Sequence, residues 1–399
     1  MTKCKDNSKW SVGVPVEESG YLWKNVPKTT KRPLDNTNHY TVVDLFCGAG
    51  GASTGFISAG FNVILGIDYF EPAMATFLHN HENSPGILGD IKRVDERIVR
   101  ECIGDTDVKV VIAGVPCQGF SLSNRKRYED DPRNQLFYEF IRFIEMLEPD
   151  MVMLENVSGM KSMGNGKVVK EIESKIAEAG MKNGKKYKVQ HRMLNAAEYG
   201  VPQLRNRLIF LGASENYSIR WPKKVYSKTG QFLTVEDAIG DLPRLQSNET
   251  KICYEASPKN KFQEKMRQGS KIILNNKAPN HPKSTIERIK YTKPGKPMYD
   301  KYKQRIRLHW GFPSPTQVCG GIRPQFQFGH PNDDRGLTIR ERARIQTFPD
   351  NYEFLGGIVQ GRVQTGNAVP PLLAEAIGRE MINEIKNPNK NKGEDLFAF

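Results

Sequence analysis

A run of β-branched and apolar residues leads into a glycine-rich turn at residues 41–51, where the chain reads TVVDLFCGAGG. A helical pattern begins near Ser53, directly after the turn. Glycine permits a tight turn and a close approach of the backbone to a ligand, and a helix start offers free amide donors. A strand, a glycine turn and a helix in this order indicate a binding site for a nucleotide-like cofactor.

Beyond this turn, short apolar runs alternate with helical patterns along residues 41–215. Alternation of this kind is typical of βαβ units, so we expect an α/β fold with a doubly wound parallel sheet. The expected strands are 41–45, 63–67, 108–113, 151–155, 188–193 and 208–211, and the expected helices between them include 72–79, 135–147 and 168–179.

Changes in composition divide the chain into four expected segments. Residues 1–38 are polar and lack periodicity, which predicts a weakly ordered extension. Residues 39–222 hold the α/β pattern. After Trp221 and Pro222 the chain becomes rich in Pro, Lys, Asn and Gly, so residues 223–359 should form a second, irregular domain. Residues 360–399 form a closing segment, with a helical pattern at 371–385 and a frayed tail.

The charge balance points to a polyanionic partner. The 399 residues carry 59 Lys and Arg against 45 Asp and Glu, a formal net charge of +14. Residues 282–307 alone contain nine Lys and Arg against two acidic residues, with three tyrosines interleaved. Basic charge can also serve solubility alone. The clustering favours a surface that contacts phosphates and bases.

Composition also excludes several classes of protein. The six cysteines are scattered without a Cys-x-x-Cys pair, so neither a disulfide framework nor a zinc site is expected. No apolar run approaches the ~20 residues of a membrane span, and the first ten residues lack a signal-like apolar core. We therefore expect a cytoplasmic protein that binds no metal and contacts no membrane.

Polar residues follow several of the predicted strands, where ligands bind in open α/β sheets. Asp68 lies where a carboxylate could accept hydrogen bonds from ribose hydroxyls. Cys117 follows the strand at 108–113; an isolated Cys is usually a small buried hydrophobe, but at this edge it could act as a thiolate nucleophile. Glu155 ends the next strand. Arg205 and Arg207 alternate, which predicts two guanidinium groups on one face.

Six motifs in this order resemble those of the DNA (cytosine-5) methyltransferases of bacterial restriction-modification type. They lie at residues 44–51, 116–118, 155–157, 203–207, 340–349 and 366–370. The resemblance covers about residues 41–374, apart from a variable stretch at roughly 223–313. It implies a Rossmann-like S-adenosylmethionine-dependent methyltransferase sheet with a smaller, irregular target-recognition domain, and a closing segment that returns to the catalytic domain.

The resemblance also implies a cofactor, S-adenosylmethionine, with Asp68 on its ribose and Asp90 on its adenine amine. The positions that match its pocket are Phe46, Gly48, Gly50, Gly51, Asp68, Tyr69, Asp90, Ile91, Pro116, Asn367 and Val369.

The reaction implied is methylation of carbon 5 of cytosine after the Cys117 thiolate adds to carbon 6. Glu155 would bond ring nitrogen 3, and Arg207, with Arg205, would bond the oxygen at position 2. The cytosine would be flipped out of the duplex. A loop carrying Gln118, Ser121 and Arg133 would close over it.

The variable region implies a double-stranded DNA partner. Arg305, Arg307 and Gln317 are candidates to read base edges, and Thr316 is a further DNA-binding candidate. The family usually has an aliphatic residue after that threonine, whereas Gln317 follows it here. A monomer is expected, with a restriction endonuclease as a functional partner at the same site.

Two other functions compete with this one. A tRNA cytosine methyltransferase shares the catalytic motifs, but its typical Cys-Phe-Thr signature is missing from this chain. A non-catalytic relative that only binds DNA would be expected to have lost Cys117 or Glu155, and both are present.

Overall fold

The computed structural model describes residues 27–35, 37–116, 135–182, 184–319 and 326–388. Contacts within the chain divide it into two compact units. The unit that we call the sheet unit takes its described residues from 19–195, 206–224 and 371–399, and the unit that we call the loop unit takes them from 196–205 and 225–370. The division assigns residues 196–205 and 360–370 to the loop unit, unlike the boundaries expected from composition.

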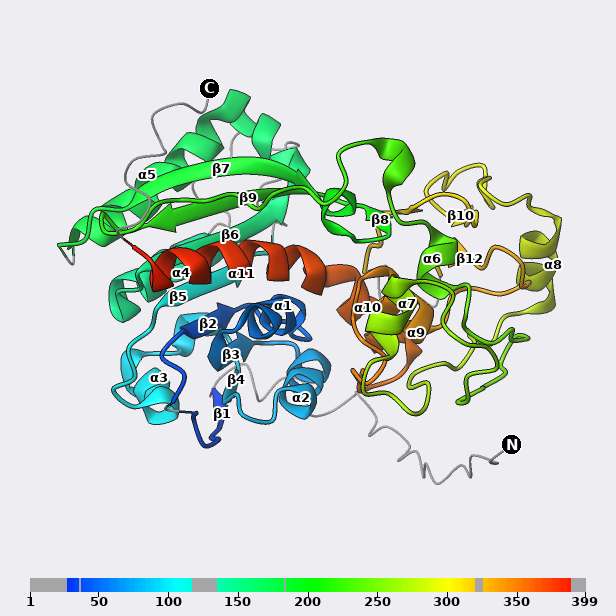
Figure 1. The fold of residues 1–399 in the computed structure, drawn as a ribbon, viewed down its shortest axis with the longest axis horizontal. Coiled ribbons are helices and arrows are strands. Elements are labelled where there is room, and N and C mark those ends of the chain that lie inside the picture. The colour runs from blue at the N-terminus through cyan, green and yellow to red at the C-terminus, as the bar shows by residue number, and fades with distance from the viewer. Residues whose placement is uncertain (1–26, 36, 117–134, 183, 320–325, 389–399) are drawn as a thin grey trace. The chain divides into compact units, whose positions relative to one another are not determined.

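An eight-stranded sheet in the order β1-β4-β3-β2-β5-β6-β9-β7 forms the centre of the sheet unit (Figure 1). Its middle strands run parallel, as the βαβ pattern predicts, and their inner residues are almost entirely buried. They are β2 (Thr41–Leu45), β3 (Asn62–Asp68), β4 (Gly86–Leu88), β5 (Val110–Gly114) and β6 (Met151–Val157).

The sheet is mixed, which corrects the expectation of a parallel sheet. β9 (Asn206–Ala213) runs antiparallel to β6 and also to β7 (Lys188–Asn195). At the opposite edge, β1 (Lys28–Thr30) pairs antiparallel with β4. Part of the polar extension therefore belongs to the sheet. β1 and β4 have only three residues each, so neither strand is long enough to show the alternating pattern by which strands are predicted from sequence.

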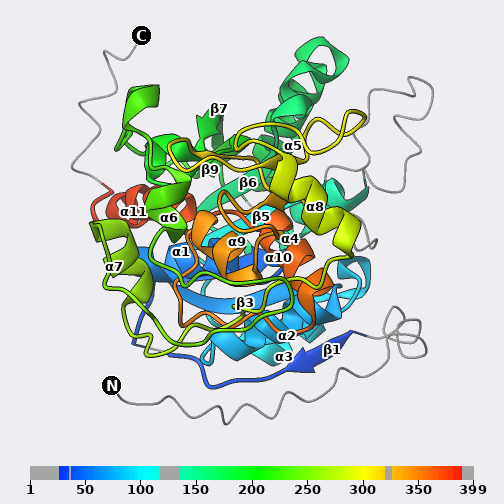
Figure 2. The same cartoon turned by 90° about the vertical axis from the view of Figure 1, so that its right-hand side faces the viewer.

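Helices cover both faces of the sheet. In Figure 2, α1 (Gly51–Ala59) and α11 (Pro371–Lys386) lie to the left of the strands, and α4 (Gln135–Leu147) and α5 (Lys167–Lys182) lie to their right. One buried cluster joins α4, α5 and α3 (Glu96–Ile103) to the strands. The remaining elements are α2 (Glu71–Asn80) and the short helices η1 (Ile91–Arg93) and η3 (Ser158–Gly166).

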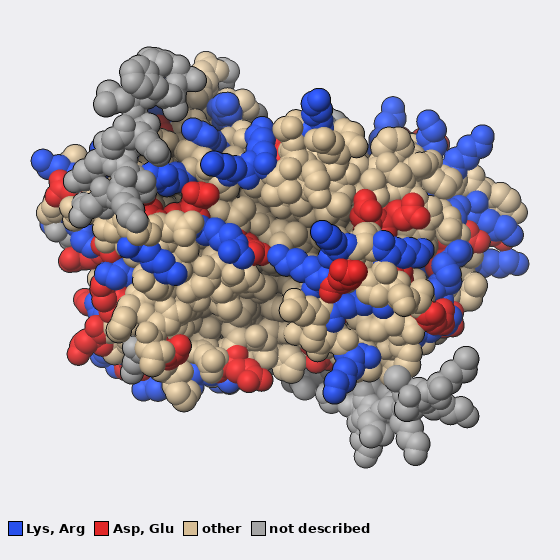
Figure 3. All heavy atoms as spheres, in the orientation of Figure 1, with Lys and Arg blue, Asp and Glu red and all other residues tan. Residues whose placement is uncertain are grey.

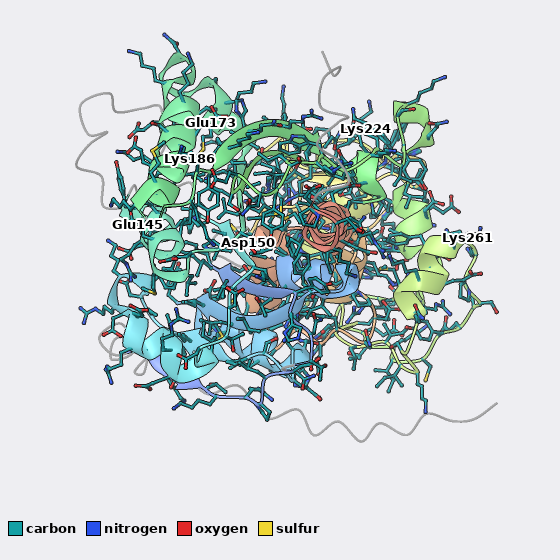
Figure 4. The ribbon with its side chains drawn as sticks, turned by 60° about the vertical axis from the view of Figure 1, so that its left-hand side comes forward. Glu145, Asp150, Glu173, Lys186, Lys224 and Lys261 are labelled. Atoms are coloured by element: carbon teal, nitrogen blue, oxygen red, sulfur yellow. The ribbon has the colours of Figure 1, made fainter. Side chains whose placement is uncertain are left out.

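Ion pairs tie the α4–α5 side of this unit together. Glu145 on α4 lies 2.6 Å from the Lys182 ammonium on α5, and Glu173 on α5 lies 2.7 Å from His191 on β7. Figure 4 shows Glu145 and Glu173 on this side of the sheet. Both pairs are partly exposed, so each adds at most about 1 kcal/mol to stability. The buried cluster, and not these pairs, holds the helices to the sheet.

Short helices and two-residue strands make up the loop unit, in line with its Pro- and Gly-rich composition. A polar core fixes them: the Arg344 guanidinium lies 3.1 Å from Asp241, and that of Arg335 lies 2.8 Å from Glu341. The elements are η4 (Ala196–Tyr199), β8 (Gln203–Leu204), η5 (Thr229–Gln231), α6 (Val235–Ile239), α7 (Lys261–Arg267), α8 (Lys283–Tyr291), β10 (Ile306–Arg307), β11 (Ser314–Pro315), β12 (Phe328–Gly329), α9 (Ile339–Ile345) and α10 (Ile358–Asn367).

In the described part of the chain, none of the helices has both the length and the apolar character that crossing a membrane requires.

Close packing of α1 against α11 gives a test of this fold. A Cβ added at Gly55 would lie 2.4 Å from the Pro371 carbonyl oxygen and 2.5 Å from the Ala374 Cβ, so Gly55→Ala should force the helices apart. We expect a loss of about 1–3 kcal/mol, read from the urea unfolding midpoint. Gly159→Ala is the control, because a Cβ at Gly159 meets no atom within 4 Å. Equal midpoints for Gly55→Ala and wild type would contradict the packing.

Candidate active site

A carboxylate from the next strand fixes the backbone of the glycine turn that follows β2. Gly48 and Gly50 adopt left-handed φ values of 55° and 83°, which favour glycine. Asp68, at the end of β3, accepts one hydrogen bond of 2.8 Å from the Gly48 N–H and a second of 2.8 Å from the Phe70 N–H. The turn is therefore preorganised around Asp68.

A second carboxylate lies beneath the same turn. Asp44, the fourth residue of β2, is buried and accepts a 2.5 Å hydrogen bond from the Ser53 hydroxyl on α1. The α1 N-cap is Gly50, which provides no side-chain cap, and the Ser53 N–H in the first turn also hydrogen-bonds to Asp44. The sequence did not reveal the role of Ser53, because a buried serine in a helix gives no distinct pattern.

Burial disfavours negative charge around the glycine turn. It raises the pKa of Asp44 to about 7, and it also raises the pKa values of Asp68 and of the Cys47 thiol. Among the described residues, no Lys or Arg contributes to any of these three shifts. Two buried carboxylates without a cation would be stabilised by a positively charged ligand. The pocket therefore fits a cationic cofactor.

Other residues of the expected cofactor pocket lie on neighbouring strand ends. Tyr69 follows Asp68 and is 67% exposed. Asp90 caps η1 by accepting a 3.1 Å hydrogen bond from the Lys92 N–H, and Ile91, the first residue of η1, is buried. Phe46 and Pro116 are half-buried at the ends of β2 and β5, and Gly51 begins α1. Asn367 and Val369 belong to the loop unit.

An ion pair joins β6 to β9 at the same edge of the sheet. The Glu155 carboxylate lies 2.6 Å from Nε of Arg207, and both side chains are nearly buried. The antiparallel register aligns Arg207 with Val157, which places it one side-chain repeat from Glu155 on the same face. The arrangement presents a carboxylate and a guanidinium side by side.

Asn156 links this ion pair to the segment that leads to Cys117. Glu155 pairs in the sheet with Gly114, at the end of β5. The Asn156 side-chain amide donates a 3.3 Å hydrogen bond to the Val115 carbonyl oxygen, which fixes the backbone just before Pro116. Cys117 itself, and the loop residues Gln118, Ser121 and Arg133, lie outside the described residues.

Arg205 and Arg207 do not point together, contrary to expectation. The Arg205 guanidinium is buried in the loop unit, where it donates to the carbonyl oxygens of Gln317, Gly366 and Ala368 at 3.0–3.3 Å. The two arginines therefore have different partners in different units. The alternation of Arg205 and Arg207 was misleading because β8 ends at Leu204 and β9 begins at Asn206.

Two of the four DNA-binding candidates in the variable region are buried. The Arg307 guanidinium donates to backbone carbonyl oxygens on both sides, including those of Ile289 and Asn332, and Gln317 is fully buried. These surroundings leave neither side chain free to read a base edge, which corrects that expectation. Thr316 is half-buried and donates a 2.7 Å hydrogen bond to the Leu204 carbonyl oxygen.

A basic and aromatic surface surrounds Arg305, the remaining candidate. The Arg305 guanidinium lies 4.6 Å from the centre of the Tyr302 ring. The Arg288 guanidinium lies 4.6 Å from the centre of the Tyr299 ring. Tyr291, at the end of α8, is 79% exposed. Figure 3 shows Lys and Arg side chains projecting from the end of the loop unit that carries α8. Cation–π pairs keep these rings and charges at the surface.

Among the described residues, no three His, Cys, Asp or Glu side chains gather closely enough to hold a metal ion.

Known proteins are similar over almost the whole chain. A type II methyltransferase of Haemophilus parahaemolyticus, M1.HphI, is 33% identical over 394 residues, covering 95% of this chain and 97% of the relative. A second type II methyltransferase, M.DdeI of Desulfomicrobium norvegicum, is 36% identical over 382 residues, covering 87% of this chain and 90% of the relative.

The fold has solved counterparts as well. A DNA modification methyltransferase encoded within an E. coli prophage has a TM-score of 0.72 at 27% identity, covering 87% of this chain and 99% of that structure. The S. pombe Dnmt2 methyltransferase shares the fold, with a TM-score of 0.58 at 16% identity, covering 87% of this chain and 99% of that structure. The family model described as C-5 cytosine-specific DNA methylase matches residues 40–383. The chain therefore belongs to the C-5 cytosine-specific DNA methylase family.

Proposed function

We propose that this enzyme transfers a methyl group from S-adenosylmethionine to carbon 5 of a cytosine flipped out of a specific short duplex DNA site, through a covalent adduct with Cys117. The Glu155–Arg207 ion pair carries the proposal, because it presents an acidic group and a guanidinium side by side at the sheet edge that leads to Cys117. Cytosine carries nitrogen 3 and the oxygen at position 2 on one hydrogen-bonding edge. These two adjacent atoms match the two adjacent side chains.

The pocket beneath the glycine turn suits S-adenosylmethionine, which carries a sulfonium and an ammonium group. Asp44 and Asp68 supply negative charge that no Lys or Arg neutralises. When bound, the cofactor supplies an electrophilic methyl group. Asp68 would accept hydrogen bonds from the ribose, Asp90 would accept one from the adenine amine, and the free amides at the start of α1 would face the ligand. Phe46, Tyr69, Ile91 and Pro116 would flank it.

Cys117 makes the ring reactive. Carbon 5 of cytosine is a poor nucleophile, so the thiolate first forms a bond to carbon 6, and electron density shifts onto nitrogen 3 and the oxygen at position 2. Carbon 5 then takes the methyl group. Loss of the proton from carbon 5 restores the double bond and breaks the sulfur–carbon bond, which regenerates the thiolate.

Glu155 and Arg207 stabilise the charge that develops during addition. Glu155 in its protonated form would donate a hydrogen bond to nitrogen 3, and Arg207 would donate to the oxygen at position 2. Arg205 would have a positioning role, because its donors are used by backbone carbonyl oxygens of the loop unit. Asn156 would hold the segment that presents Cys117.

Target recognition would belong to the loop unit. Lysines of residues 282–307 and the surface around Arg305 would contact phosphates and bases. Gln118, Ser121 and Arg133 would close over the flipped cytosine. Relatives named as type II methyltransferases support a role beside a restriction nuclease that cuts the same site. We infer that the enzyme acts as a monomer on DNA in the cytoplasm of a prokaryotic cell.

The methylated position can be tested with a fluorinated substrate. Bisulfite sequencing of DNA from cells that express this chain should reveal one short methylated site. A duplex with fluorine at carbon 5 of that cytosine has no proton to lose after methyl transfer. With S-adenosylmethionine, the wild-type enzyme should therefore stay attached to it as a slow band in denaturing electrophoresis.

Two cysteine variants identify the nucleophile. Cys117→Ser should give no slow band while still binding cofactor and DNA, because a serine hydroxyl is a far poorer nucleophile than a thiolate. Cys47→Ser should still give the band, since burial and the nearby carboxylates raise the pKa of Cys47 and keep it protonated. A Cys117→Ser variant that traps the duplex as well as wild type would refute the assignment, and modification of tRNA alone would refute the substrate.

The cofactor site predicts a pH dependence. A cation bound beside Asp44 favours the ionised carboxylate, so binding should release protons near neutral pH. Because burial raises the pKa of Asp44 to about 7, affinity for S-adenosylmethionine should increase from about pH 6 to about pH 8 and then level off. Asp44→Asn should flatten this profile in calorimetric titrations. The exposed-residue control Asp105→Asn should retain it. A wild-type affinity that does not change with pH would place the cation elsewhere.

A further inference from the structure

Two buried arginines of the loop unit have no carboxylate partner in the described part of the chain. Arg342 lies in the middle of α9, and Arg362 lies on α10 and is only 8% exposed. The two helices pack together, and Arg342 donates a 3.4 Å hydrogen bond to the backbone carbonyl oxygen of Arg362. Two positive charges are thus held close together in the interior of the unit.

Several other buried arginines of this unit lie beside carboxylates, whereas Arg205 donates to backbone carbonyl oxygens. On the same helix, Arg344 lies 2.5 Å from Asp350 and Arg340 lies 3.8 Å from it. Arg335 forms ion pairs with Glu341 and Asp333, at 2.8 Å and 2.9 Å. Burial of an unpaired charge is costly, which is why buried charges are normally paired. The Arg342–Arg362 pair departs from the rule that its neighbours follow.

Unused donors remain on both side chains. Arg342 donates from Nε to the Thr365 hydroxyl at 3.0 Å and from Nη2 to the Val318 carbonyl oxygen at 3.1 Å. Among the described residues, Nη1 of Arg342 has no hydrogen-bond acceptor, and the whole Arg362 guanidinium has neither an acceptor nor an ion-pair partner. Guanidinium groups with free donors bind phosphate oxygens well, because their geometry matches.

The local field is positive. Burial and the charge of Arg362 lower the pKa of Arg342 to about 9, and burial lowers that of Arg362. The pKa of His281 falls to about 4, because of burial, Arg362 and Arg335. No Asp or Glu that the structure describes contributes to any of these three shifts. An anion bound beside Arg342 and Arg362 would offset the repulsion between their two positive charges.

We propose that Arg362 and Nη1 of Arg342 form a binding site for a phosphate group of the DNA backbone. The inference rests on the proposed function, which supplies the DNA. The site adjoins Val318, whose side chain is 47% exposed, and the exposed Cys319, so it lies next to a surface segment of the loop unit. A backbone phosphate held there would position the duplex without reading its sequence.

Arg362→Gln tests the site, because it removes a charge that has no protein partner. We expect DNA binding about tenfold to a hundredfold weaker on every sequence, and a slope of log K against log salt lower by about one. The thermal midpoint of the free protein should stay equal or rise, since like-charge repulsion is relieved. A fall of several degrees would instead assign Arg362 a structural role and overturn the proposal.

Arg97→Gln is the matched control, because it removes the same charge from an exposed arginine on α3 that pairs with Glu101. It should leave both the affinity and the salt slope close to wild type. If Arg362→Gln and Arg97→Gln bind DNA equally well, the buried pair does not contact the duplex.

Experiments with inorganic phosphate distinguish a phosphate of the DNA backbone from free phosphate as the ligand of this site. Millimolar phosphate should raise the thermal midpoint of wild type more than that of Arg362→Gln, and should compete with DNA for wild type. Stabilisation by phosphate, combined with unchanged DNA affinity in the variant, would indicate a free-phosphate site and overturn the DNA assignment. Failure of the proposed function would appear separately, as a wild-type protein that neither binds nor methylates duplex DNA while phosphate still protects it.

Discussion

The ion pair between Glu155 and Arg207 is the interaction on which the catalytic edge of the sheet depends. It exists only because β9 runs antiparallel to β6, which brings the first residues of β9 beside the last residues of β6. A parallel β9 would carry Arg207 to the opposite end of the sheet. Asn156 extends the same arrangement to the backbone before Cys117. The reversal of one strand thereby brings together an acid, a guanidinium and the backbone that precedes Cys117, the proposed nucleophile.

The sequence predicted what local patterns determine. All six expected strands of the α/β pattern and the helix at 135–147 are present, because buried parallel strands and amphipathic helices have distinct periodicities. The direction of β9 could not be predicted, since strand pairing depends on tertiary contacts. Arg307 and Gln317 were wrong candidates for base contact for a similar reason: a basic or polar residue in a loop-rich region looks the same in sequence whether it is exposed or buried.

Unbalanced buried charge marks the proposed ligand sites within each unit. In the sheet unit, Asp44 and Asp68 lie beneath the glycine turn with raised pKa values and no cation. In the loop unit, Arg342 and Arg362 lie together with no carboxylate. Other buried charges are paired, as Arg344 with Asp350 illustrates in the loop unit. Charges left unpaired in this way are expected where a ligand of opposite charge completes the site.

Glu155 and Arg207 should act as one catalytic unit, and a double-mutant cycle on the single-turnover rate of DNA methylation tests this most directly. We expect Glu155→Gln and Arg207→Gln each to slow methyl transfer by about a hundredfold or more, with folding and cofactor affinity retained. The double variant should be no slower than the slower single variant, because the two side chains stabilise the same developing charge. Effects that multiply in the double variant, or a single variant within a few-fold of wild type, would contradict the account.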